Sequence, residues 1–366
     1  MRIPSLLELG PEQQDVIDLP FQGSHVVTGP PGGGKTVMAV YRTWALAAAG
    51  RDVVLVTRFN LLRQYIAQLA PELTDAIGIT TWERWIAALW RARFRTDPPR
   101  CAEDSLSYDW FEMQRNCVVQ GVGAKIHLVI DEGQNLPLGF YQLCRILGIE
   151  VTVFADENQR ISDEQSTLSE IRRTLTPASE PLVLPANYRN SREIAMLASG
   201  FRVEGREEIP LSEPSGRTPV VMRVPSLDAL ATGISQYVSA HPGWTIGIIC
   251  RSILMMRDIR RRLSTLGLAR RTQTYFHDSH ERDTIDFSTH PIKIVSTASM
   301  KGLEFDSVFV PDLDSYTEDP TSVEARLRFL VLCTRARKDI HFAHRDSEEP
   351  AILSDVPDSL LLRHSG

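Results

Sequence analysis

A glycine-rich run near the amino terminus ends in a lysine and a threonine. It follows a β-rich stretch at residues 25–28 and precedes a helical pattern that begins at Thr36. A loop in this position can receive phosphates with its backbone N–H groups and with the amino end of the helix. Lys35 would place a cation beside the β- and γ-phosphates, and the Thr36 hydroxyl would bind Mg²⁺. The nucleotide-binding residues that this spacing predicts are Gly29, Pro30, Pro31, Gly32, Gly33, Gly34, Lys35 and Thr36.

An apolar stretch at residues 126–131 ends in the carboxylate pair Asp131 and Glu132. Asp131 is expected to hold the metal ion, and Glu132 is expected to act as the general base that polarises an attacking water. Together with the loop, this pair predicts a site that binds ATP or GTP with Mg²⁺. Kinases, GTPases, transporters and helicases all fit that chemistry, so the function depends on the rest of the chain.

Strand-like and helix-like runs alternate around these residues. In the first half they are expected at residues 25–28, 36–49, 53–57, 61–69, 126–131 and 151–156. Their βαβα order implies a parallel sheet, with ligands gathered where its strands end. Turn-forming residues at 176–181 precede a second series. Its strands are expected at 220–224, 245–250, 292–297, 307–310 and 340–343, with a helix at 227–240.

The composition indicates a soluble globular protein of two domains. The chain has 366 residues, 43% of them apolar, and a net charge of −6. With this charge, nucleic acid could bind only to a local basic surface. Residues 257–262 hold the densest arginine group, which a solvated helix face also explains. Five cysteines without CxxC spacing argue against zinc and disulfides, and no apolar stretch suits a membrane helix or signal peptide. We therefore expect a cytoplasmic protein without membrane contact.

Read in order, the remaining motifs resemble the UvrD-like branch of superfamily 1 DNA helicases, from about Leu9 to about Phe342. Gln13, in a stretch similar to the family's Q motif, would read adenine and favour ATP over GTP. Gln159, in the motif III run at residues 156–159, would sense the γ-phosphate. The resemblance also identifies Asp131 and Glu132 as part of the family's DExQ motif II.

Three later motifs complete the ATP site that this resemblance implies. Tyr188 would stack on adenine and the adjacent Arg189 would reach the γ-phosphate. Glu304, in the KGLEF motif V, belongs to the same ATP site. Arg335, in the TRA motif VI, would act as an arginine finger from the second lobe. The resemblance thus implies the catalytic residues Lys35, Glu132, Gln159, Arg189 and Arg335.

Nucleic-acid contacts follow from the resemblance as well. Phe59 and Asn60 lie in the counterpart of motif Ia, Thr81 and Trp82 in that of motif Ib, and Ser299 just before motif V. A strand end and a helix cap are the alternative interpretation of the first two motifs. Two departures weaken the match: residues 160–164 lack the aromatic that stacks on a base, and Ala298 replaces the usual motif V histidine.

These observations predict an α/β protein of two RecA-like lobes with parallel sheets, of the P-loop NTPase class. The lobes are expected at residues 1–180, with a short insertion at about 86–124, and at 181–345. A C-terminal tail at 346–366 is expected to be loosely held, with a docking segment as the alternative. The second family insertion is nearly absent. Hydrolysis in a cleft between the lobes would move them.

The predicted function is that of an ATP- and Mg²⁺-dependent single-strand DNA translocase or compact helicase, acting on single-stranded or tailed DNA. The alternative is an ATP-hydrolysing regulatory subunit of a nuclease-containing complex, as in antiphage defence, with a separate nuclease or other protein as partner. A small-molecule kinase would share the loop and the metal carboxylate, but it would leave the NYR, KGLEF and TRA motifs unexplained.

Overall fold

The computed structural model describes residues 4–69, 71, 77–102, 104, 107–156, 165–177, 179–203, 216–276, 285–287 and 289–365. The chain divides into two compact units. The first comprises residues 1–29 and 34–185, and the second comprises residues 30–33 and 186–366. The boundary lies beyond the predicted residue 180 because a short strand, Leu182–Val183, still pairs with the first sheet.

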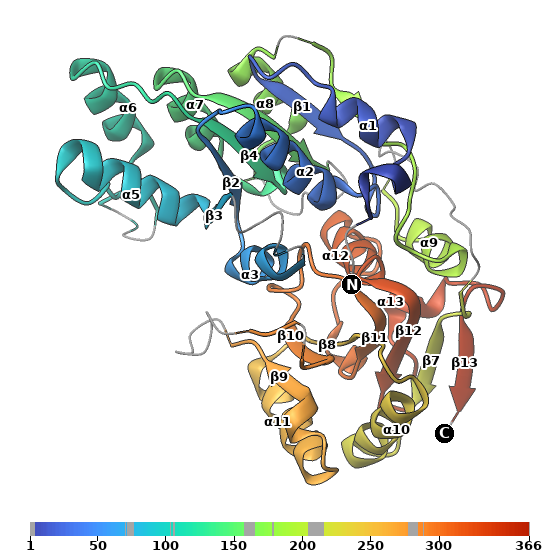
Figure 1. Ribbon diagram of the computed structural model, residues 1–366. Helices are drawn as coiled ribbons and strands as arrows, with labels where there is room; N and C mark the ends of the chain where they lie inside the picture. The colour runs from blue at the N-terminus through green and yellow to red at the C-terminus, as the bar shows by residue number, and fades with distance from the viewer. Residues whose placement is uncertain are drawn as a thin grey trace. The chain divides into compact units, whose positions relative to one another are not determined.

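The first unit contains a six-stranded sheet in which every pairing is parallel (Figure 1). Its strand order is β3 (Gly78–Thr81), β2 (Val53–Thr57), β4 (His127–Asp131), β5 (Glu150–Ala155), β1 (His25–Thr28) and β6 (Leu182–Val183). Strands β4, β5 and β1 are neighbours at its centre and are almost wholly buried, as parallel strands covered on both faces require. Their carboxyl ends therefore bring the loop after β1 beside the carboxylates after β4 and β5.

Helices cover the first sheet: α1 (Pro11–Ile17), α2 (Lys35–Ala48), α3 (Asn60–Leu69), α5 (Trp82–Phe94), α6 (Trp110–Val119), α7 (Leu138–Ile146) and α8 (Leu168–Leu175). Short 3-10 turns lie at η1 (Leu6–Glu8) and η2 (Gly133–Asn135). Helices α5 and α6 occupy the predicted insertion. They are no separate domain, because Trp85, Trp90 and Met113 belong to the same buried core as Leu128 of β4 and Phe140 of α7.

The second unit contains a seven-stranded sheet, also parallel throughout. Its order is β13 (Leu362–Ser365), β7 (Val220–Arg223), β12 (Ala336–His344), β11 (Phe305–Val310), β8 (Ile246–Cys250), β10 (Ile292–Ser296) and β9 (Thr272–Thr274). Its helices are α9 (Arg192–Ser199), α10 (Leu227–Ala240), α11 (Ile253–Thr265), α12 (Val323–Cys333) and α13 (Ala351–Ser354), with 3-10 turns η4 (Ala269–Arg271) and η6 (Leu313–Ser315). The two sheets and their helices confirm the predicted α/β class.

The expected loose tail is the main correction to this organisation. Residues 351–354 form α13, and β13 adds an edge strand to the second sheet, with Leu362 opposite Val220 of β7. Leu353 and Leu361 are fully buried. Apolar burial together with strand pairing therefore fixes this segment, and it belongs to the second unit.

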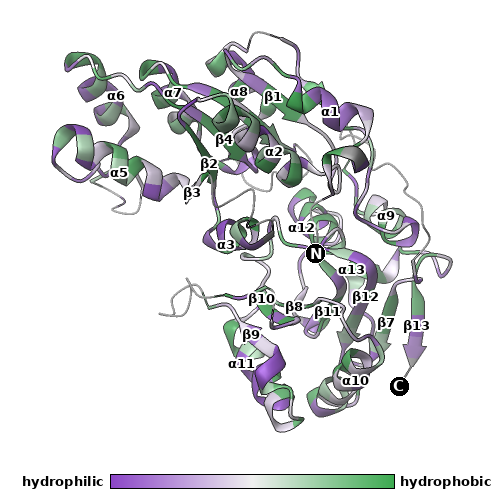
Figure 2. Cartoon of the chain, in the orientation of Figure 1, coloured by the Kyte–Doolittle hydropathy of each residue, from purple (hydrophilic) through white to green (hydrophobic). Residues whose placement is uncertain are grey.

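Hydropathy follows this architecture. In Figure 2 the central strands of each sheet are hydrophobic, whereas hydrophilic residues lie along α11. Four of the five cysteines, Cys117, Cys144, Cys250 and Cys333, are buried, and all five are free thiols. Within the described ranges, no helix has the length and apolar character needed to cross a membrane.

Candidate nucleotide site

The glycine-rich loop joins β1 to α2, as the spacing predicts. Gly34 has φ 84° and forms the N-cap of α2, so the loop needs a residue without a Cβ there. A Cβ on Gly34 would lie 2.7 Å from Nε2 of Gln13, which places the Gln13 amide against the loop. The amino end of the 14-residue helix α2 therefore lies beside Gln13, and its N–H groups and helix dipole can bind an anion.

Lys35, the first residue of α2, is buried and points back along the loop. Its Nζ donates to the carbonyl oxygen of Gly29 at 2.6 Å and forms an ion pair with Oδ2 of Asp156 at 3.2 Å. Asp156 directly follows β5 and is itself buried. The ammonium group is therefore fixed at the carboxyl edge of the sheet by two strand ends.

Asp131 ends β4 and is buried. Its Oδ1 accepts a hydrogen bond from the Glu132 N–H at 3.1 Å, whereas its Oδ2 has no hydrogen-bond partner within the described residues. Burial, and next the Glu132 carboxylate, raise the pKa of Asp131 to about 7; hydrogen bonding to Thr36 and the Lys35 charge act in the opposite direction. A buried carboxylate oxygen without a partner, near a hydroxyl, fits Mg²⁺, which takes few protein ligands alongside phosphates and waters.

Glu132 adopts a backbone conformation that is rare outside glycine, with φ 58° and ψ 42°. Its Oε2 accepts hydrogen bonds from Nε2 of Gln134 at 2.6 Å and from Nδ2 of Asn135 at 3.4 Å. Strained residues held by their surroundings concentrate at functional sites. The carboxylate is therefore oriented by two amides, as a base that must meet a particular water would require.

Gln134 forms two hydrogen bonds that the sequence does not reveal. Besides its bond to Glu132, its Oε1 accepts the backbone N–H of Asp156 at 3.0 Å. One buried side chain thus connects the residue after β4 to the residue after β5. Its place in the DExQ motif indicates a functional position. The motif does not predict the contact with Asp156, which lies 22 positions away in sequence.

The NYR, KGLEF and TRA motifs come together within the second unit. Arg189 forms an ion pair with Glu304, and both side chains are largely buried. Tyr188 remains 53% exposed. The Phe305 N–H donates to the carbonyl oxygen of Arg335 at 2.9 Å. The structure therefore groups Arg189, Glu304 and Arg335 as one cluster, which their positions in sequence do not require.

Arg335 is fully buried, which differs from an extended finger. Its Nε donates to the carbonyl oxygen of Val331 at 2.9 Å, and its two Nη atoms donate to the Leu303 carbonyl at 3.2 Å and the Thr334 hydroxyl at 3.1 Å. To reach a phosphate, the guanidinium would have to exchange these acceptors for phosphate oxygens. Gln159, the expected γ-phosphate sensor, lies outside the described residues.

The expected nucleic-acid residues lie at strand ends of their own sheets. Phe59 and Asn60 follow β2, and Ser299 follows β10, where its N–H donates to the Ser296 side chain at 3.2 Å. Thr81 caps α5 by accepting the Arg84 N–H at 3.4 Å. This is the helix cap that the sequence left as the alternative.

Trp82 does not fit its expected contact with a base. It is 8% exposed and its ring packs among Tyr108, Trp110 and Phe140, with centroids 5.6, 6.0 and 6.1 Å away. A ring enclosed by other aromatics has no face left on which a base can stack. Tyr108, Trp110 of α6 and Phe140 of α7 come later in sequence, so the local sequence around Trp82 does not reveal that they enclose it.

No family model and no curated protein matches the chain. Among solved structures, it is similar to Saccharomyces cerevisiae Dbp5 bound to RNA and ADP BeF3, at 11% identity and a TM-score of 0.59, covering 98% of this chain and 90% of that one. A point variant of Dbp5 in the same bound state gives 13% identity, a TM-score of 0.57 and coverages of 99% and 95%. The C-terminal domain of a possible DNA helicase from Lactobacillus gives 18% identity, a TM-score of 0.37 and coverages of 49% and 99%.

The likeness to Dbp5 concerns the fold. It extends over nearly all of both chains and therefore includes both parallel sheets of this chain. The predicted fold class of two RecA-like lobes is therefore confirmed.

Proposed function

We propose that the protein is an ATP-hydrolysing motor acting on single-stranded nucleic acid, a DNA translocase or compact helicase of UvrD-like type. The observation that carries this proposal is the meeting of Lys35, Thr36, Asp131 and Glu132 at the carboxyl edge of the first sheet. Support comes from the motif order and from the similar fold of Dbp5, whose structures contain RNA and ADP BeF3.

Each site residue receives one role in this proposal. Thr36 and Asp131 would hold Mg²⁺, which neutralises phosphate charge when bound. Lys35 binds the phosphates, Gln13 reads adenine and Glu132 accepts a proton from the attacking water. Tyr188 and Glu304 bind the nucleoside, while Gln159, Arg189 and Arg335 respond to the γ-phosphate. To do so, Arg189 and Arg335 would exchange their present acceptors, the Glu304 carboxylate and backbone carbonyls of the second unit, for phosphate oxygens of the nucleotide.

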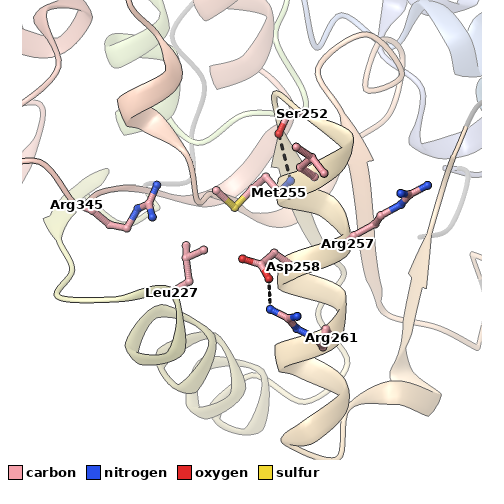
Figure 3. Close-up of a pocket in the computed structure, with 8 residues that line it drawn as sticks. Leu227, Ser252, Met255, Arg257, Asp258, Arg261 and Arg345 are labelled. Atoms are coloured by element: carbon pink, nitrogen blue, oxygen red, sulfur yellow. Dashed lines mark hydrogen bonds and ion pairs between the residues drawn. The ribbon is translucent and has the colours of Figure 1, made fainter.

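For the nucleic acid, we propose a hollow of about 570 Å³ at the carboxyl ends of β7, β8 and β12 (Figure 3). Arg345 lies on one side of it and α11, with Asp258, on the other. Three arginines and one aspartate line it: Arg257, Arg261, Arg345 and Asp258. Ser252 and the apolar side chains of Leu227, Leu254 and Met255 complete the lining, and the apolar ones could contact a sugar or base. Phosphate contacts of this kind give affinity without sequence preference.

Two helix termini add to the positive character of the hollow. Ser226 and Ser252 cap α10 and α11 by accepting the N–H groups of Ala229 and Met255, each at 3.1 Å. Leu227 and Ser252, at the amino ends of these helices, both line the hollow. The positive end of each helix dipole therefore reinforces the arginines.

Removing arginines from the hollow should weaken binding of single-stranded DNA and its dependence on salt. For the Arg261→Ala and Arg345→Ala variants, the slope of log affinity against log salt should fall by about one for each phosphate that the variant no longer neutralises. Fluorescence anisotropy with a labelled oligonucleotide across a salt series measures it. Arg260→Ala is the matched control, since Arg260 is exposed on α11 outside the hollow. Equal slopes in all variants would place the strand elsewhere.

The proposed function predicts that nucleic acid accelerates ATP hydrolysis. Steady-state ATPase rates should rise with single-stranded or tailed DNA and remain near the basal rate with blunt duplex. The same assay with RNA separates DNA from RNA preference. Identical turnover with every nucleic acid would remove the motor function and leave an ATPase.

Identical ATP turnover with and without nucleic acid would favour a regulatory subunit that works beside a nuclease or another protein. The supporting observation is the small insertion of the first unit, where α5 and α6 join the unit's own core instead of forming a separate accessory domain. Purification from the native source as a stable complex would support this alternative, and a solitary protein in every nucleotide state would oppose it.

A further inference from the structure

Asn190 connects two of the motifs in the second unit. Its Nδ2 donates to the carbonyl oxygens of Thr334 at 3.1 Å and Ala336 at 2.5 Å. These carbonyls belong to the residues on either side of Arg335. Asn190 is 2% exposed, so its amide makes these bonds without competition from solvent.

The backbone of Asn190 is held from the other direction. Oδ1 of Asn187 accepts the N–H groups of both Arg189 and Asn190, each at 3.1 Å. Asn187 thereby fixes the turn that carries Arg189, and Asn190 extends from the same turn to the segment that carries Arg335. A short chain of hydrogen bonds therefore runs from one arginine to the other.

An asparagine amide suits this link better than a side chain of similar size, such as aspartate, would. Thr334 is the C-cap of α12, where carbonyl groups lack partners within the helix, and Ala336 begins β12. Two carbonyl acceptors require two N–H donors on one side chain, which asparagine has. An aspartate of the same shape would offer only acceptors and would repel both carbonyl oxygens.

We propose that Asn190 is a positioning residue that fixes Arg189 and Arg335 relative to each other within the second unit, so that both arginines act on the nucleotide together. The inference rests on the proposed ATPase function. As a positioning residue, Asn190 would act through the two arginines and not through contact with nucleotide or metal. Its contribution therefore belongs to turnover and not to nucleotide affinity.

The test compares Asn190→Asp with Ser191→Ala. Because a misplacement of about 1 Å can cost about 10²-fold in rate, Asn190→Asp should lower kcat by about that factor while KM for ATP and the affinity for a fluorescent ATP analogue stay unchanged. Ser191→Ala removes a neighbouring side chain that caps α9 but keeps the Asn190 amide, so it should lower thermal stability and leave kcat unchanged.

A double-mutant cycle distinguishes positioning from general destabilisation. In single-turnover measurements, Asn190→Asp should have a smaller effect when Arg335→Ala is already present than in the parent protein, because one of the two arginines that it positions is gone. Full additivity of the two effects, or an unchanged kcat in Asn190→Asp alone, would overturn the proposal.

A readout independent of hydrolysis separates this link from the proposed function. Hydrogen exchange of the backbone amides at residues 334–337 should become faster in Asn190→Asp and stay unchanged in Ser191→Ala. Unchanged exchange in Asn190→Asp would overturn the link whatever the ATPase result. Faster exchange in a protein that hydrolyses no ATP would support the hydrogen-bond link but overturn its role in turnover, together with the proposed function.

Discussion

Replacing Arg335 by alanine is expected to lower ATP turnover by roughly 10³- to 10⁵-fold, the range found when an arginine finger is absent. Binding of ATP should survive, because Gln13, Lys35 and Thr36 all belong to the first unit, whereas Arg335 belongs to the second. Single-turnover hydrolysis and equilibrium binding of a fluorescent nucleotide, measured on the same preparation, separate the two properties.

Burial of Arg335 requires controls for folding in this experiment. Its removal leaves the carbonyl groups of Val331 and Leu303 without that donor, so the thermal melting temperature should fall as well. Arg335→Lys keeps a charge in the same place. Arg337→Ala is the matched control, because Arg337 lies two residues away, is partly exposed and faces Asp306. Full turnover by a folded Arg335→Ala protein would show that the second unit supplies no finger at this position.

Replacing Glu132 by glutamine is expected to preserve nucleotide binding and to lower hydrolysis by about 10² to 10⁴, the usual contribution of a positioned general base. The amide has nearly the shape of the carboxylate and can still accept hydrogen bonds from Gln134 and Asn135. It cannot accept the proton of the attacking water. Rapid-quench measurement of phosphate release, paired with nucleotide binding, would detect this separation.

A carboxylate on the surface of the same unit supplies the control for Glu132. Glu112 in α6 pairs only with neighbours on its own helix, Arg115 and Asn116, in the contacts that the structure shows. Glu112→Gln should therefore hydrolyse ATP at the normal rate. Normal hydrolysis by Glu132→Gln would instead assign the base to a different group.

Much of the fold could be predicted because parallel strands are short, apolar and closely followed by helix caps. The strands at 25–28 and 53–57 and the helix at 227–240 have the expected bounds. The sequence does not predict the edge strand β13, because Leu360, Leu361 and Leu362 are consecutive apolar residues without alternation and only β7 gives the strand a partner. Local sequence patterns therefore predict strands and helices with a clear periodicity. For a segment with a weak pattern, such as β13, pairing with a distant strand decides whether it forms a strand.

The candidate site divides in the same way. Motif spacing predicted Lys35, Asp131 and Glu132, which lie at the carboxyl ends of β1 and β4, on either side of β5. It could not show that Trp82 is enclosed by aromatics or that Arg335 is bonded to the carbonyl of Leu303, because contacts between residues far apart in sequence leave no periodic signal. Residue types and spacing thus predicted a nucleotide site, whereas tertiary contacts determine which of the predicted side chains are accessible.

The left-handed backbone of Glu132 has a consequence for how this position can evolve. Holding a non-glycine residue in such a conformation costs about 1–3 kcal/mol, which glycine would avoid. Selection for stability alone would favour glycine here, whereas selection for turnover would require the carboxylate in its proposed role as general base. A lineage that gave up hydrolysis while keeping this fold would therefore be expected to lose the glutamate early and to gain thermal stability from the loss.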